Sequence, residues 1–89
     1  MEKWLKEDVA TRALLAFVVK TITGKEEFSG AIELDFRDGG IRGGRPPIPE
    51  GVDRKRQAFL VQRILPSKRY NGTVRLGTNL GVINDVTVT

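Results

Sequence analysis

The chain of 89 residues contains neither cysteine nor histidine. The absence of cysteine excludes disulfide bridges, thiolate nucleophiles and the thiolate ligands of structural zinc sites. The absence of histidine excludes imidazole as a general base or metal ligand. Long apolar runs are missing too, because the longest, residues 13–19, is far too short to span a bilayer. The N-terminal MEKWLKED is charged and amphipathic, so we expect a cytoplasmic protein with no membrane partner.

Hydrophobic residues make up 39% of the chain, which is too many for a disordered tail and enough for one small core. We therefore expect residues 1–89 to form a single domain. A chain of this length buries roughly two-thirds of the surface that it exposes when unfolded. The resulting stability is marginal, which leaves a homodimer open as an alternative to a monomer.

The net charge of +4 comes from one basic segment in the middle of the chain. Residues 1–41 carry six Lys or Arg against eight Asp or Glu, residues 42–69 carry eight against two, and residues 70–89 carry one of each. A localised basic patch attracts polyanions, so the segment favours nucleic acid as a partner. A basic surface that only keeps the protein soluble is the competing interpretation. The candidate nucleic-acid-binding residues are the eight cations of this segment: Arg42, Arg45, Arg54, Lys55, Arg56, Arg63, Lys68 and Arg69.

The chain repeats itself weakly at an offset of 42 residues. Residues 16–41 align without a gap over residues 58–83, with eight identities that fall on apolar and glycine positions. Two similar αββ units explain this pattern, whether they arose by duplication or by convergent packing. The units are expected at residues 1–44 and 53–89, with a Pro/Gly-rich connector at residues 45–52.

A helix is expected to open the first unit. Its apolar residues recur at helical spacing: Trp4, Leu5, Val9, Ala13, Ala16, Phe17 and Val18. The β-branched run 18–23 should weaken this helix, and Gly24 should end it.

A hairpin is expected to complete the first unit. Residues 28–36 alternate between apolar and polar, which predicts a strand with one buried face. Asp38 and Gly39 predict a tight type I′ turn, because both central residues of that turn need positive φ. A return strand should begin at Ile41 and soon be broken by glycines.

The second unit repeats this order. Asp53 is expected to cap a helix that runs to about Ile64 and is stopped by Pro66. Its inward residues are expected to be Phe59, Leu60 and Ile64. A second alternating strand at residues 70–76, a turn at 79–81 and a final strand at 82–89 should follow.

The two units together predict an α+β fold, with a four-stranded antiparallel sheet and both helices on one face. A pseudo-two-fold axis would then relate the two halves. Two winged-helix-like fragments exchanged between the chains of a dimer are the alternative arrangement.

Catalysis finds little support in the sequence, and we expect neither enzymatic activity nor a cofactor. Glu33, Asp35 and Asp38 could hold Mg²⁺ through carboxylate oxygens, which makes a metal-dependent nuclease a minor alternative. Arg75 stands at the repeat position equivalent to Glu33, so an exposed cross-strand ion pair explains Glu33 better. No metal site is therefore expected.

The segment GGIRGGRPPIPEG at residues 39–51 carries Arg42 and Arg45. It resembles the AT-hook core, Arg-Gly-Arg-Pro, with one additional glycine. That resemblance implies arginines on a flexible arm that reaches into the minor groove of DNA. A plain connector between the two units is the other interpretation.

The leading hypothesis is a small regulatory domain that binds nucleic acid without catalysis. Arg54, Lys55 and Arg56 should lie in the first turn of the second helix, where the helix dipole disfavours cations. Cations at that place indicate a requirement other than stability, and an anionic partner supplies one. The alternative is a protein-interaction or assembly module, such as a phage or host-regulatory protein, that docks on an acidic partner.

Overall fold

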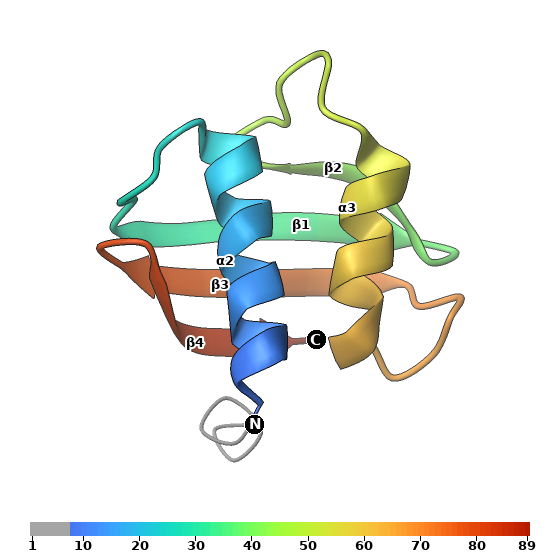
Figure 1. The fold of residues 1–89 in the computed structure, drawn as a ribbon. Coiled ribbons are helices and arrows are strands. Elements are labelled where there is room, and N and C mark those ends of the chain that lie inside the picture. The colour runs from blue at the N-terminus through green and yellow to red at the C-terminus, as the bar shows by residue number, and fades with distance from the viewer. Residues whose placement is uncertain (1–7) are drawn as a thin grey trace.

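The computed structural model describes residues 8–89 of the chain. Two helices lie side by side over one face of a four-stranded sheet (Figure 1), which confirms the expected α+β class. The elements in chain order are α2 Val9–Thr23, β1 Gly30–Arg37, β2 Gly40–Arg45, α3 Arg54–Val61, the 3₁₀ turn η1 Gln62–Ile64, β3 Gly72–Asn79 and β4 Val82–Val88. The expectations for Trp4 and Leu5 fall outside the described residues. Within them, no helix is long and apolar enough to cross a membrane.

The sheet order is β2-β1-β3-β4, and every neighbouring pair is antiparallel. The two hairpins therefore meet at the central pair, β1 and β3. Glu33 stands directly opposite Arg75 in that pair, and the same two residues match in the sequence repeat. All four strands come from one chain. A common origin of the two units stays a prediction.

Both hairpin turns use the left-handed backbone region. Asp38 and Gly39 have φ values of 53° and 81°, and Leu80 and Gly81 have 51° and 81°. Positive φ at both central residues is what a type I′ turn requires, as predicted for Asp38 and Gly39.

Helix α2 begins after Asp8, whose Oδ1 accepts a hydrogen bond of 3.0 Å from the backbone N–H of Thr11. It ends at the left-handed Gly24, as predicted. The expected weakening in the run 18–23 does not occur, because branched side chains of that run pack on the sheet and burial outweighs helix propensity. The buried residues of α2 are Thr11, Leu15, Val18, Val19 and Ile22.

The apolar residues that recur at helical spacing do not all face the sheet, although Val18 is buried. Val9 and Phe17 are 73% and 47% exposed, and Ala13 is exposed as well. The helix is apolar on two stripes, and only the stripe that begins at Thr11 faces the sheet.

Helix α3 begins at the predicted cap, where Asp53 Oδ1 accepts a hydrogen bond of 3.1 Å from the N–H of Arg56. The α-helix is shorter than expected and passes into η1 before Pro66. Phe59 was expected to face inward, but it is 71% exposed, while Ala58 and Val61 are buried.

Strand β2 continues through the glycines that were expected to break it. Gly44 pairs with Leu34, and its lack of a side chain allows β2 to lie close beneath the connector. A Cβ at Gly44 would stand 2.8 Å from the Glu33 carbonyl oxygen and 3.3 Å from Ile48 Cγ1. Ile48 is buried in the core, so the middle of the connector is anchored to the domain.

Candidate nucleic-acid interface

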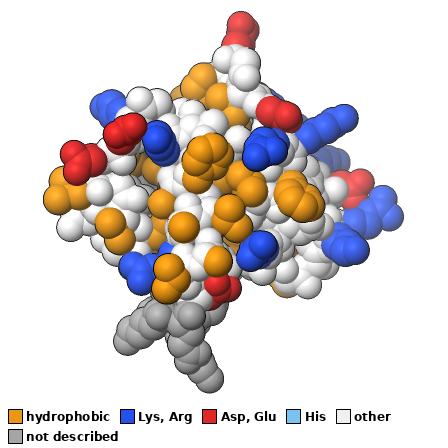
Figure 2. Space-filling view, in the orientation of Figure 1, with side chains coloured by type: hydrophobic (Ala, Val, Ile, Leu, Met, Phe, Trp, Pro, Cys, Tyr) orange, Lys and Arg blue, Asp and Glu red, His pale blue; other side chains and the backbone are white. Residues whose placement is uncertain are grey.

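All eight candidate basic residues have exposed side chains. Several Lys and Arg side chains gather on the side of the molecule that carries α3 (Figure 2). Only two of the eight form ion pairs within residues 8–89: Arg45 with Glu33, and Arg69 with Asp38. The other six leave most of the charge of the basic segment available to a partner.

A shallow hollow of about 330 Å³ brings two lysines from separate parts of the basic segment together. Lys55 from α3 and Lys68 from the loop before β3 both line it. The exposed ring of Phe59 also lines the hollow, as do Gly39 and Gly40 of the tight turn. We call this surface the basic edge, defined by Lys55, Lys68, Phe59 and the Gly39–Gly40 turn.

Asp38, the carboxylate among the described residues that line this hollow, is already paired. Arg69 donates from Nε to Asp38 Oδ1 at 2.7 Å and from Nη2 to Oδ2 at 3.4 Å. These hydrogen bonds, together with the opposite charges, lower the pKa of Asp38 and raise the pKa of Arg69. Because Asp38 is paired with Arg69, it competes poorly with an external anion for Lys55 and Lys68.

Backbone contacts hold the same turn in place. The Gly39 N–H donates to the Tyr70 carbonyl at 3.0 Å, and the Asp38 N–H donates to Asn71 Oδ1 at 2.9 Å. Tyr70 packs on Phe36 and its hydroxyl donates to the Thr89 carbonyl, so it packs against the core rather than out toward a partner. The loop that carries Lys68 is thus tied to the hairpin.

No family model, curated protein or solved structure matches the chain. The arrangement of its own side chains is therefore the ground for a functional proposal.

The two arginines of the AT-hook-like segment do not form an arm. Arg42 is an extra residue in β2, between Ile41 and Gly43, which pair with consecutive residues of β1. Its carbonyl accepts a hydrogen bond of 2.9 Å from Arg54 Nη1, which joins β2 to the start of α3. Arg45 stands opposite Glu33 on the sheet face away from the helices, at 3.8 Å. Because both arginines belong to a paired strand, the flexible arm that the AT-hook resemblance implies is not formed.

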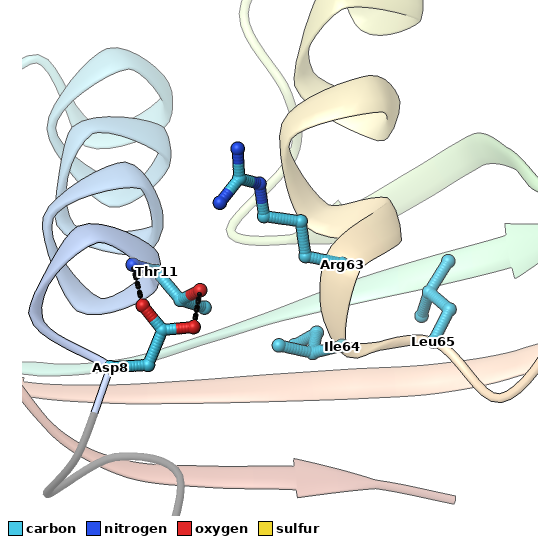
Figure 3. A pocket seen from close by; sticks show the side chains of 5 residues that line it. All are labelled: Asp8, Thr11, Arg63, Ile64 and Leu65. Atoms are coloured by element: carbon cyan, nitrogen blue, oxygen red, sulfur yellow. Dashed lines mark hydrogen bonds between the residues drawn. The ribbon is translucent and has the colours of Figure 1, made fainter.

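Arg63 lines a second hollow, of about 310 Å³, between α2 and η1 (Figure 3). Its guanidinium points toward α2, where Thr11 donates from its backbone N–H and its hydroxyl to the two oxygens of Asp8. Those hydrogen bonds are the main cause of the lowered pKa of Asp8, and the charge of Arg63 adds to it. Arg63 therefore does not line the hollow that holds Lys55 and Lys68.

The carboxylates considered for Mg²⁺ have other partners. Asp35 Oδ1 accepts a hydrogen bond of 3.1 Å from Thr73 Oγ1, while Glu33 and Asp38 pair with arginines. Within residues 8–89 no three acidic side chains gather to hold a metal ion. The expected Glu33–Arg75 ion pair is not formed there either, because Arg75 pairs with Asp85 at 3.5 Å.

Phe59 is the residue of the basic edge that the sequence interpretation missed. It lies four residues after Lys55 and four before Arg63, both of which are exposed. Residues four apart share a helix face, so this spacing already indicated an exposed ring.

Proposed function

We propose that this protein is a small, non-enzymatic nucleic-acid-binding domain whose basic edge contacts the phosphate backbone. The observation that supports the proposal most is the meeting of Lys55 and Lys68 in one hollow, with the nearby Asp38 neutralised by Arg69. The exposed lysines act as point charges that replace the counterions of the phosphates.

The ring of Phe59 gives the basic edge a second means of contact. An exposed aromatic ring beside cations is the combination that binds single-stranded nucleic acid, because a base stacks on the ring while its phosphates meet the cations. Phe59 is 71% exposed, so stacking requires no opening of the core. The proposal therefore favours single strands over a duplex.

Fluorescence anisotropy with labelled single-stranded DNA, RNA and duplex DNA at low salt tests the proposal. The double variant Lys55→Ala/Lys68→Ala should weaken binding and flatten the dependence of log K on log salt by about 0.7 per lost phosphate contact. The matched control is Lys25→Ala/Arg75→Ala, which removes two cations away from the basic edge. Absence of binding at micromolar protein in about 50 mM salt, where phosphate contacts are strongest, rejects the proposal.

A further inference from the structure

The outer surface of α2 carries an apolar stripe that the domain does not use. Val9, Ala13 and Phe17 recur every four residues and are exposed, while the stripe that begins at Thr11 packs on the sheet. A surface helix normally has polar residues on the side opposite its buried stripe. The second stripe of α2 is thus typical of a helix with a second packing partner.

Helix α3 extends this apolar surface. A hollow of about 300 Å³ lies between the helices, lined by Leu14, Phe59, Leu60, Gln62 and Arg63. Hydrophobic side chains gather over both helices, with Lys and Arg side chains at the borders (Figure 2). Phe17 follows Leu14 by three residues on α2, so the two share a helix face. We call the surface formed by Leu14, Phe59 and Leu60, with Phe17 beside Leu14, the helix groove. Both helices cover the same face of the sheet, and each carries an exposed phenylalanine, Phe17 and Phe59, which is typical of an interaction surface.

The border of the helix groove is positively charged. Arg56 and Arg63 precede and follow Phe59 at helical spacing and so share its face. Within residues 8–89, neither arginine forms an ion pair. Both oxygens of the nearby Asp8 accept hydrogen bonds from Thr11. An occupant with negative charge at its edges would complement this border.

We infer that the helix groove binds an amphipathic helix of a partner protein, with an apolar face in the groove and acidic residues toward Arg56 and Arg63. A third helix can pack in the groove between two adjacent helices at the usual interaxial distance of about 8–10 Å. A second copy of this chain fits the groove less well, because a symmetric contact would bring two basic borders together. This docking goes beyond nucleic-acid binding and shares only Phe59 with the basic edge.

The test uses a designed helical peptide of about 18 residues, long enough to form a stable helix, with a Leu stripe flanked by Glu. Its matched control has the same Leu stripe flanked by Lys. The Glu peptide should bind, the Lys peptide should bind at least about tenfold more weakly, and Phe17→Ser should weaken the Glu peptide about tenfold. Arg63→Glu should reverse the preference between the two peptides. Val82→Ser removes a side chain that is 55% exposed elsewhere and should leave binding unchanged.

Several outcomes overturn the inference. One is failure of the Glu peptide to bind, and another is equal binding of both peptides. A dimer in sedimentation that Phe17→Ser dissociates would make a second copy the occupant. Measuring nucleic-acid binding separates this surface from the basic edge. The variant Phe17→Ser should still bind nucleic acid. The variant Lys55→Ala/Lys68→Ala should lose nucleic-acid binding and still bind the peptide. Loss of nucleic-acid binding in Phe17→Ser would assign the groove to the nucleic-acid surface instead.

Discussion

Asp38 and Arg69 join the tip of the β1–β2 hairpin to the loop before β3 through two hydrogen bonds, of 2.7 and 3.4 Å. Both side chains are largely exposed, so solvent screens the pair and its weight in the total stability is small. The pair acts locally. It holds the loop that carries Lys68, the residue next to Arg69, and Lys68 lines the basic edge.

The Asp38–Arg69 pair predicts an acid-sensitive component of stability. The pKa of Asp38 is lower in the folded protein, so the stabilisation is present above the pKa of the unfolded chain. It is lost as the pH falls through the lower, folded pKa. Asp38→Asn keeps a residue type that tolerates the positive φ of this turn and removes the titrating group. Urea unfolding from about pH 6 to pH 2 should therefore show a smaller loss of stability for Asp38→Asn than for the wild type.

Asp8 stays in both proteins, and its lowered pKa contributes equally to the two curves. The difference between the curves therefore isolates Asp38. Parallel curves would show that the pair does not stabilise the fold.

Gly39→Ala is predicted to destabilise the protein and weaken nucleic-acid binding together. Gly39 has a φ of 81°, and a Cβ there would overlap the Lys68 carbonyl oxygen. The left-handed backbone alone disfavours alanine by about 1–2 kcal/mol, and displacement of the Lys68 backbone adds to that. Gly51→Ala is the matched control, because its φ is 90° and no described atom lies within 4 Å of its Cβ. Chemical denaturation should show the larger loss for Gly39→Ala, and only this variant should bind nucleic acid more weakly.

The strands and turns follow from local patterns, which explains why they could be predicted. Alternation with a period of two places Ile32, Leu34 and Phe36 on one face, whatever lies on the other side of the core. Which side of each helix is buried depends instead on how its side chains pack against the sheet. Apolar residues surround much of α2, so periodicity alone does not choose between the stripes that contain Leu15 and Phe17.

The composition of the candidate site could be predicted better than its geometry. Charge counting found the basic segment, but the pairing of β2 decides that Arg45 meets Glu33 on the far sheet face. The approach of Lys68 to Lys55 depends on the loop before β3, which is anchored by contacts to the hairpin. Such long-range contacts have no periodic signal in a single sequence.

Gln57→Met is predicted to stabilise the protein. Gln57 is 3% exposed, and its Oε1 has no hydrogen-bond partner within residues 8–89. Methionine has a similar volume and removes the unpaired polar atom, so the free energy of unfolding should rise by about 1 kcal/mol. Thr11→Val is the contrasting variant: Thr11 is also buried, but its hydroxyl donates to Asp8, so stability should fall by a similar amount, about 1 kcal/mol. A loss of stability in Gln57→Met would mean that Oε1 has a partner in solution.

Lys55→Glu, at the start of α3, is predicted to change the stability and the nucleic-acid binding of the protein in opposite directions. The first turn of this helix contains no acidic residue, although the helix dipole favours negative charge there. Replacing Lys55 by Glu should raise the free energy of unfolding by about 0.3–1 kcal/mol. The same change removes a cation from the hollow and should weaken nucleic-acid binding at low salt. Thermal unfolding and anisotropy on one preparation measure both effects. Opposite changes would indicate that Lys55 is present for an anionic partner, while a fall in stability would identify it as a structural residue.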